Sequence, residues 1–439
     1  NVASATADAD VVTNSCRFDG TSAYMGLTLG TPTNNKIYTF SAWVKRSKLG
    51  QYGCMLNAGS SRDCFRFRGD NDHLHFFTGD ATTGGLETNR VFRDPSAWYH
   101  LVCAVDTTQA TDTNRVKLYV NGVQETSFTN SDYPAQDYTN VINSAVENRI
   151  GKASNIYDEY FGGYMAEAVF IDGQQLTPTS FGEYDEDSPT IWKPIDVSGL
   201  TFGDNGFYLD FEASDNLGND ANGGSDFSET NLAAADQATD TPTNNYCTLN
   251  PLEAVTAATT YAQGNTQGTT SNAARATFAV TNGKWYWEHK AVNKEAMGGV
   301  MAYDGFAPND YTINALISCH GPNLVLNGSE ESGWADGTPD ALVDNDILQV
   351  ALDCDNNRIA FGVNGAWYNA TDGSGEWSGT TLNYFSISDG YYYSPAFRTG
   401  SGSNRESHFN FGGCPGFAIT SSNADANGYG NFEYAVPSG

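Results

Sequence analysis

Several side chains in this sequence have types and spacings suited to metal binding or acid–base catalysis. His73 and His75 are two residues apart, so a strand would place both imidazoles on one face, where they could begin a metal site. No third ligand can be named, and we expect two surface histidines. Glu183 and Asp185 begin an E-x-D-x-x-E pattern, with which retaining glycosidases place a nucleophile and an acid about 5 Å apart, but Ser188 takes the last position. Because no nucleophile, zinc or phosphate-binding motif is present either, we expect no enzymatic activity.

A second group of acidic residues lies in a turn-rich stretch. Asp210, Asp215, Asp220 and Asp226 are threaded with Asn and Gly, and their carboxylates could offer oxygen ligands to Ca²⁺. The spacing of an EF-hand is absent, so a solvated turn is the alternative interpretation. Ca²⁺ is the one candidate cofactor that the residues indicate, and both interpretations stay open.

The aromatic residues fall into two classes. Trp285 and Trp287 share a strand face and are expected in a core. Others lie in turn-rich contexts, where rings can stack on sugars while neighbouring Asp and Asn side chains bond the hydroxyl groups. Consecutive tyrosines in a strand must point both ways, so at least one leaves the core. We predict a ligand-binding surface from Trp334, Trp377, Tyr391, Tyr392 and Tyr393.

The composition narrows the range of partners. The 439 residues carry 22 Lys plus Arg against 52 Asp plus Glu, a formal net charge of −30. This charge repels phosphate backbones, so we expect no nucleic-acid partner. No apolar run reaches the ~18–20 residues that cross a bilayer, so we expect no membrane insertion. The sequence opens on Asn1 and not on Met, and we expect a processed chain or part of a longer polypeptide.

The eight cysteines lack the C-x-x-C spacing of a zinc knuckle. Cys103 and Cys354 lie in strand patterns and are expected as small core residues. Cys54 and Cys64 flank a short turn and could face each other across a hairpin. We expect a fold that needs no disulfide bond.

The elements that would position these side chains are strands. NRVKLYVNG (residues 114–122) and NRIAFGVNG (residues 357–365) are nearly the same, and both end in Asn-Gly, the pair that favours a type I′ hairpin turn. Each copy alternates apolar with other residues, which predicts a half-buried strand. One face of each strand should carry Val116, Leu118 and Val120 in the first copy, and Ile359, Phe361 and Val363 in the second.

The length exceeds what a single core usually serves, so more than one domain is expected. Residues 188–199, SPTIWKPIDVSG, carry two prolines between polar residues and predict a linker. We predict an all-β protein of two tandem β-sandwiches: a first domain at 1–195, a connecting segment with the entry strands of the second sandwich at 196–275, and a second domain at 276–439.

Two family resemblances support this organisation. Residues 17–176 resemble the laminin-G-like jelly roll of the concanavalin A-like superfamily, through FDGTSAYM, YTFSAWVKR, WYHLVCAVD, VKLYVNG and GGYMAEAVFIDGQQLT. Residues 276–413 resemble a SPRY domain, through GKWYWEHK, GGVMAY, DNDILQVALDCDNNRIAFGVNG and YSPAFR. The resemblances imply concanavalin A-like and SPRY-like sandwiches in series. Loop-bound calcium is common in the laminin-G family, which favours the cation interpretation of the acidic turn.

Residues 202–252 resemble segments of bacteriophage virion proteins, in which such domains occur together. This resemblance implies a non-enzymatic tail or head fibre on the virion surface that attaches to a host surface glycan or receptor. It would contact other virion proteins and form a homo-oligomer, for which a trimer is the first guess. Recognition is placed in the SPRY-like half, which has more turn-borne aromatic residues. The alternatives are a capsid decoration or cement protein without a ligand, and a secreted polysaccharide-binding module or enzyme.

Overall fold

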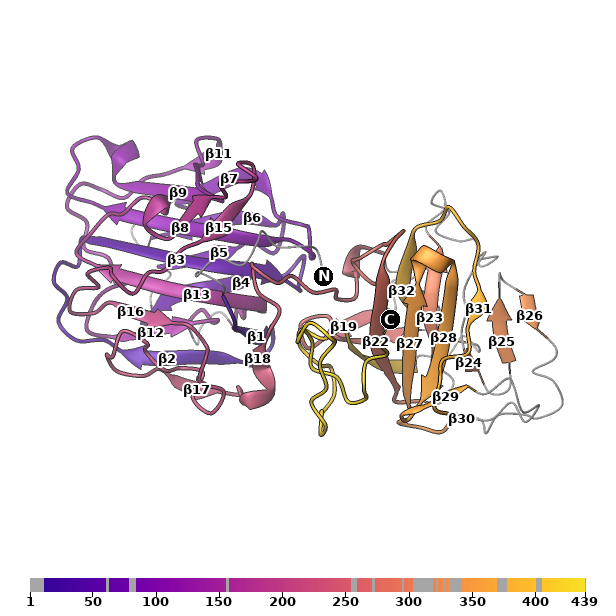
Figure 1. Cartoon of the computed structure of the whole chain (residues 1–439). Coiled ribbons are helices and arrows are strands. Elements are labelled where there is room, and N and C mark those ends of the chain that lie inside the picture. Colours follow the sequence, from indigo (N-terminus) through magenta and orange to yellow (C-terminus); the bar gives the residue numbers. More distant parts are fainter. Residues whose placement is uncertain are drawn as a thin grey trace. The chain divides into compact units, whose positions relative to one another are not determined.

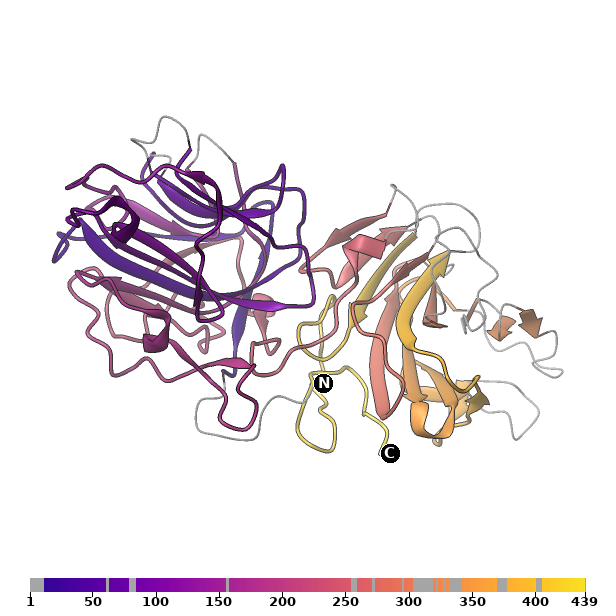
Figure 2. The same ribbon diagram turned by 90° about the horizontal axis from the view of Figure 1, so that it is seen from above.

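The chain forms two compact units, Asn1–Asn245 and Tyr246–Gly439, which are described separately. Figure 1 colours the first from indigo to magenta and the second from salmon to yellow, and Figure 2 shows the same ribbon from above. The computed structural model describes residues 12–60, 63–78, 84–154, 158–253, 259–270, 273–293, 296–302, 319–320, 323–326, 329–331, 342–368, 377–399 and 405–438.

Both units are built from β-strands. The helices in the described residues are single 3₁₀ turns: η1 (Asp112–Asn114), η2 (Pro178–Ser180), η3 (Ala234–Asp236), η4 (Pro251–Glu253) and η5 (Cys354–Asn356). Within these described ranges, none of the helices has the length and apolar character needed to cross a membrane.

Two large antiparallel sheets make the sandwich of the first unit, and we name each after one of its strands. The β3 sheet has the order β10 (Val123–Gln124), β9 (Val116–Val120), β8 (Trp98–Asp106), β3 (Ile37–Arg46), β13 (Gly162–Asp172), β1 (Ser15–Asp19) and β18 (Gln237–Ala238), and β16 (Phe207–Leu209) pairs with β13. The β6 sheet has the order β11 (Phe128–Ser131), β7 (Leu86–Val91), β6 (His73–Phe77), β5 (Cys64–Phe67), β4 (Gly53–Ala58), β12 (Glu147–Ile150), β2 (Tyr24–Thr28) and β17 (Ser228–Thr230).

The two sheets bury one common core between them. Alternate residues of each strand point inward, because successive side chains of a strand lie on opposite faces. Phe40 of β3 meets Phe65 of β5 with ring centroids 6.2 Å apart, so the core spans both layers. Val116, Leu118 and Val120 belong to this core, which confirms the predicted face of the first repeated strand.

One buried carboxylate joins loops that are far apart in sequence to the β3 sheet. Asp172, at the end of β13, accepts hydrogen bonds from the backbone N–H groups of Thr33 (2.6 Å), Asn34 (3.3 Å) and Asn205 (3.2 Å) and from the side-chain amide of Asn143 (2.6 Å). A carboxylate with this many donors satisfies backbone groups that burial would otherwise leave unpaired.

The second unit is also a sandwich. Its larger sheet has the order β19 (Thr260–Ala262), β20 (Gln267–Thr270), β33 (Arg405–Asn410), β22 (Lys284–Ala291), β27 (Ile347–Asp353), β28 (Arg358–Val363), β29 (Ala366–Tyr368) and β30 (Trp377–Gly379), and β31 (Phe385–Ser386) pairs with β28. It packs on a sheet of β21 (Ala273–Arg275), β32 (Tyr393–Thr399) and β23 (Ala296–Ala302), and their shared core includes Ile359, Phe361 and Val363, as predicted. A small sheet contains β24 (Cys319–His320), β25 (Asn323–Leu326) and β26 (Ser329–Glu331).

The predicted Asn-Gly turns are present in both units. Asn121 and Gly122 have φ values of +47° and +79°, and Asn364 and Gly365 have +50° and +89°. Two successive positive φ values define the type I′ turn, which joins β9 to β10 and β28 to β29. The repeated sequence therefore forms the same type of hairpin in both sandwiches.

The division between the units differs from the expected one. Residues 196–245 belong to the first unit, because β16, β17 and β18 pair with β13, β2 and β1. The expected linker at 188–199 lies inside this unit, where β15 (Trp192–Pro194) pairs with β14 (Gly182–Tyr184). Pro189 lies in the connection between these two strands and Pro194 ends β15, so neither marks a domain boundary.

Candidate functional site

The outer surface of the β6 sheet is lined by polar and charged side chains. On β5, Phe65 and Phe67 point into the core, so Arg66 between them points outward. The same alternation directs other side chains to this surface. We call it the polar face, defined by Tyr24, Asn57, Arg66, His73, His75, Glu87 and Arg149, with Tyr52, Lys152, Glu159 and Tyr160 at its border.

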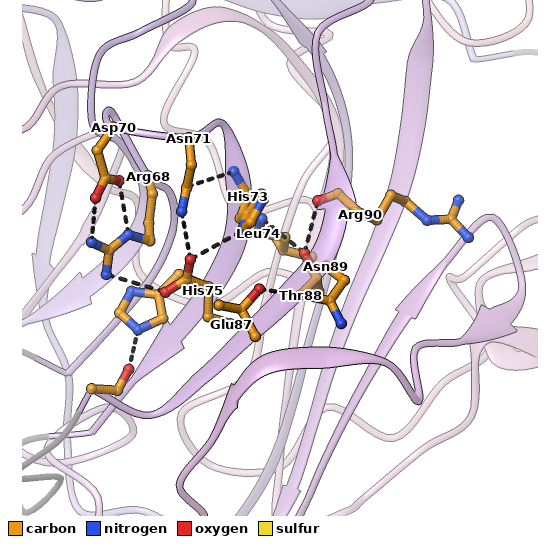
Figure 3. Close-up of polar contacts among 12 residues, drawn as sticks. Arg68, Asp70, Asn71, His73, Leu74, His75, Glu87, Thr88, Asn89 and Arg90 are labelled. Carbon is orange, nitrogen blue, oxygen red and sulfur yellow. Dashed lines mark hydrogen bonds and ion pairs between the residues drawn. The ribbon is translucent and has the colours of Figure 1, made fainter.

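Glu87 on β7 is the centre of one hydrogen-bonded group on the polar face (Figure 3). It is 7% exposed, and its Oε1 accepts from the amide of Asn71 (2.6 Å) and from Nδ1 of His73 (2.9 Å). Its Oε2 lies 3.3 Å from the guanidinium of Arg68, which also makes a two-pronged contact with Asp70 (2.9 and 2.6 Å). The carboxylate fixes three donors in defined directions.

His75 has both ring nitrogens occupied, as Figure 3 shows for its bond to a backbone carbonyl. Its Nε2 donates to the carbonyl oxygen of Gly84, and its Nδ1 accepts from Nε of Arg66 (3.3 Å). Arg66 is paired in turn with Glu159. Burial lowers the pKa of His75 to about 4, so the ring is neutral at pH 7. This buried histidine corrects the expectation of two surface histidines, and neither ring nitrogen of His75 is available to a metal.

A second charged group lies across β12 and β4. The guanidinium of Arg149 donates to the carbonyl oxygen of Gly59 (2.8 Å) and to Oδ1 of Asn57 (3.4 Å), and it is paired with Glu147. Gly26 on the neighbouring strand lets the Glu147 carboxylate approach, because a Cβ there would lie 2.9 Å from Oε1. Backbone and side chains therefore hold the guanidinium in one orientation.

Tyrosine rings lie between these charged groups. The ammonium group of Lys152 is 4.6 Å from the centre of the Tyr24 ring and 4.9 Å from that of Tyr160. The guanidinium of Arg66 lies 4.8 Å from the Tyr52 ring centre. Each ring is half-buried, so an edge or part of a face reaches solvent. Flat rings beside fixed donors and acceptors are the components with which proteins bind small polar ligands.

The outer surface of the β3 sheet is different, because the chain covers it with its own residues. We call residues 176–202 the strap and the sheet surface beneath it the covered face. The sheet and the strap form one apolar cluster of Val102, Ala104, Tyr119, Val169, Ile171, Phe181, Val197 and Phe202. Trp43 stacks on His100 at 4.8 Å, and Trp192 of the strap stacks on the same ring at 6.0 Å.

The covered face contains a serine–histidine pair that does not have the arrangement of a nucleophile and its base. Nε2 of His100 lies 2.8 Å from Oγ of Ser41, and Nδ1 lies 2.9 Å from Nε1 of Trp192. The indole N–H can only donate, so Nδ1 accepts and the ring proton is on Nε2. The ring therefore donates to Ser41 and cannot take its proton. Burial lowers the pKa of His100 to about 3.

Glu167, also on the β3 sheet, has a raised pKa. It sits in a β-bulge of β13 with φ +49°, and its carboxyl accepts a hydrogen bond from the Tyr208 hydroxyl at 2.6 Å. Burial, together with the charges of Asp210 and Glu212, raises the pKa of Glu167 to about 7, although the tyrosine bond opposes the shift. The group is protonated in part near neutral pH.

The structure separates the predicted aromatic site residues. Trp334 lies outside the described residues, and Trp377 begins β30, where only its backbone is described. Tyr391 is half-buried against the second core, and Tyr392 is 56% exposed. Tyr393 is 2% exposed and its hydroxyl donates to the carbonyl oxygen of Ser388, so it is a core residue. The expectation that at least one of the three tyrosines leaves the core is confirmed by Tyr392.

The acidic turn uses its carboxylates to hold its own backbone. Asp220 accepts from the N–H groups of Tyr208 (2.9 Å), Asn222 (3.0 Å) and Gly224 (3.1 Å). Asp226 accepts from the N–H of Asp220, Asp210 accepts from that of Glu212, and Asp215 is exposed. Among the residues that the structure describes, no group of three or more His, Cys, Asp or Glu side chains is placed to hold a metal ion. Asp210, Asp220 and Asp226 thus each hold a backbone N–H group of the turn, and Asp220 is buried.

The sequence analysis did not find the polar face. The signal was present in three neighbouring strands, CFRF, HLHFF and LETNRV, in which Arg66, His75 and Glu87 each follow an inward-pointing apolar residue. Their grouping depends on register, since Arg66 opposes His75 and His75 opposes Glu87. Cys54 and Cys64 are free thiols and lie in one small buried cluster.

Comparison with known proteins agrees with this architecture. Residues 19–180 match the family described as the concanavalin A-like lectin/glucanases superfamily, of laminin-G type. No curated protein sequence matches the chain. The described residues form an all-β protein of two sandwiches, and the match to the concanavalin A-like family lies within the first.

Solved structures resemble the chain at low sequence identity. The SPRY domain of human HERC1 is 19% identical over 34% of this chain and 82% of its own, with a TM-score of 0.25. A Bacteroides ovatus protein whose proposed role is carbohydrate binding is 14% identical over 50% of this chain and 58% of its own, with a TM-score of 0.33. The heptameric SAP-like pentraxin of Limulus polyphemus is 14% identical over 39% and 80%, with a TM-score of 0.30.

Proposed function

We propose that the protein binds carbohydrate on the polar face of its first sandwich. The observation that carries the proposal is the lining of this face: paired charges held in fixed orientations with tyrosine rings between them. A sugar presents hydroxyl groups that need both donors and acceptors, and C–H faces that pack on rings. Arg66, Glu87 and Arg149 supply the fixed polar groups, and Tyr24, Tyr52 and Tyr160 supply the rings.

The energetics of the ion pairs support a binding role. Side chains of Arg66 and Glu159 are 16% and 13% exposed, so both charges are largely removed from water. Such pairs add little to stability, because desolvation offsets much of their attraction, and apolar residues of similar size often do as well. Their value on this face is that they hold polar groups in fixed directions, which favours the binding of a ligand. The family to which residues 19–180 match includes lectins by its description.

The wider role that we propose is attachment of a bacteriophage particle to a host surface glycan, as part of a tail or head fibre. The support is the virion resemblance of residues 202–252 and the net charge of −30, which suits a soluble, displayed surface. Single sites of low affinity would act together if several copies were displayed, as in the trimer guessed from this role. Capsid decoration without a ligand is the competing role.

A binding role fits the described side chains better than catalysis. The His100 pair is in the wrong tautomer, and Asp185 is turned to the backbone N–H groups of Asp187 and Ser188. We therefore propose a protein without enzymatic activity.

The test measures binding of the full chain to purified bacterial capsular polysaccharides and lipopolysaccharide O-chains fixed on a sensor surface. Tyr52→Ala and Tyr160→Ala should each weaken binding about 5–10-fold or more, since truncating a central aromatic contact costs over 1 kcal/mol. Tyr184→Ala is the matched control, because Tyr184 is 46% exposed but lies in the strap.

Two outcomes would contradict the proposal. If the protein binds neither this panel nor intact bacterial cells, capsid decoration becomes the better account. If it binds but only Tyr392→Ala weakens the interaction, the site lies in the second unit, as the sequence predicted. Tyr429→Ala, 48% exposed in that unit, controls for loss of a surface tyrosine there.

A further inference from the structure

The far end of the covered face buries a lysine against two possible reaction partners. Lys45 on β3 has a side chain 1% exposed, and its Nζ lies 2.7 Å from Oδ2 of Asp240 and 2.8 Å from Oδ1 of Asn245. The Asp240 side chain is 2% exposed and also accepts from Nε1 of Trp98 at 3.0 Å. A lysine, an amide and a carboxylate therefore meet in one largely buried contact.

We propose that Lys45 and Asn245 form an intramolecular isopeptide bond, with Asp240 as the proton carrier. The Nζ lone pair of the neutral amine attacks Cγ of Asn245 and forms a C–N bond. The Cγ–Nδ2 bond then breaks, and Nδ2 leaves as ammonia after taking a proton from the attacking nitrogen through Asp240. One amine and one amide give one secondary amide and one ammonia, so no oxidant or reductant is needed.

The geometry brings the reacting atoms close. A carbonyl bond is about 1.23 Å long, so with an Nζ···Oδ1 distance of 2.8 Å the carbon of Asn245 lies within about 4 Å of Nζ. The leaving group is also held, because Nδ2 of Asn245 donates to the carbonyl oxygen of Ser96 at 2.8 Å. Fixed neighbours at such distances turn a slow bimolecular reaction into a fast intramolecular one.

Two aromatic residues flank the lysine on the sheet. Lys45 lies between Trp98 and Tyr164 in the strand registers, and its Nζ is 5.8 Å from the Tyr164 ring centre. The attack requires a neutral amine, and we assign Asp240, whose Oδ2 lies 2.7 Å from Nζ, as the group that takes the proton.

The bond would close the first sandwich at its C-terminal end. Asn245 is the last residue of the first unit, and Lys45 lies in the β3 sheet of that unit. A covalent bridge between them would prevent the final segment from peeling away from β3 and would restrict the unfolded chain, as a disulfide does. Such a bridge suits a protein that carries mechanical load.

The test is the intact mass of the purified full chain, followed by peptide mapping. We expect a mass about 17 Da below that of the sequence, equal to one ammonia, and a branched peptide that joins Lys45 to Asn245. Asp240→Asn should have the full mass calculated from its own sequence, with no loss of ammonia. Circular dichroism would check that this variant is folded. Lys36→Ala should keep the deficit, because the Lys36–Asp137 pair is an ordinary surface contact at 3.0 Å.

The wild-type mass decides the question even if a variant fails to fold. A full sequence mass that persists after long incubation of the folded protein at pH 8 would overturn the proposal. A deficit of about 18 Da with a peptide joining Lys45 to Asp240 would also overturn it, since that bond expels water and uses the carboxylate as the reacting group.

Discussion

The two outer faces of the first sandwich are built from strands of the same kind, yet they carry opposite chemistry. The covered face presents Trp43, His100 and Val169 to a strap of the same chain. The polar face presents Arg66 and Glu87, whose partners are other charged groups. Apolar side chains are buried by the chain itself because exposing them to water is costly. The buried charged side chains of the polar face are satisfied by one another, through ion pairs and hydrogen bonds.

This difference assigns structure to one face and recognition to the other. On the covered face, the strap completes the fold, and its contacts include Trp192 on the His100 ring. On the polar face, the contacts orient side chains without filling a core, and half-buried tyrosines stand beside them. Substitutions on the covered face should therefore affect stability, and those on the polar face should affect binding more than stability.

The largest effect is expected when the chain is cut where the sequence placed the first boundary. A fragment of residues 1–195 lacks five large core residues, Phe207, Leu209, Phe211, Leu217 and Phe227. Each contributes about 1.5–3 kcal/mol on burial, so their loss removes on the order of 10 kcal/mol, comparable to the whole stability of a domain. Residues 1–245 should unfold cooperatively in urea, and 1–195 should show no transition. Equal midpoints for the two fragments would refute the boundary at Asn245.

A smaller effect is expected from Trp43→Ala on the covered face. The side chain is 4% exposed and stacks on His100, so its removal leaves a cavity costing about 3–5 kcal/mol. Urea unfolding should show this loss of stability, while the affinity for a bound polysaccharide should change less than twofold at a temperature where the variant is folded. A large loss of affinity would show that the two faces are not separate in function.

The smallest effect is expected from Glu167→Gln, and it depends on pH. The pKa of Glu167 is about 7 in the folded protein against an ordinary value of 4.5, so the folded state binds the proton more tightly. Its contribution to stability is therefore full below pH 4.5 and is lost as the pH rises through 7. The free energy of unfolding of the variant should exceed that of the wild type by on the order of 1–2 kcal/mol at pH 8, and the two should be equal near pH 4.5.

The control for this comparison is Glu183→Gln, whose carboxylate makes a surface contact with Lys193 at 3.4 Å. It should show no change in stability that tracks pH between 4.5 and 8. If Glu167→Gln behaves in the same way, the carboxyl of Glu167 is better solvated than its contact with Tyr208 indicates.

Local signals in the sequence were sufficient for the strands and hairpins. The alternation around Val116 and Phe361 fixed the buried faces, and Asn121 and Asn364 fixed the turns, because both depend on neighbouring residues alone. The end of the first unit was not predictable in this way. The strands that complete it, β16, β17 and β18, are two or three residues long, too short to show a period.

The candidate site was harder to predict for a related reason. The sequence predicted a binding surface from aromatic residues in turns. Of the three consecutive tyrosines, however, only Tyr392 is exposed, and Tyr393 packs in the core. The polar face depends on which strands pair, since β7 places Glu87 opposite His75 of β6. This pairing also brings the Glu87 carboxylate to Arg68, Asn71 and His73, and no local pattern gives it. Arg66, alternating with Phe65 and Phe67, looks in sequence like an ordinary surface residue.

The central claim, that ligand binds on the polar face, is tested most directly by hydrogen–deuterium exchange of the full chain with and without the polysaccharide that it binds. Bound ligand slows the exchange of amides that it orders or shields. We predict slower exchange in β5, β6, β7 and β12, with no change in the strap at residues 176–202. Slower exchange confined to the strap, or to β32 and the tyrosines before it, would contradict the account.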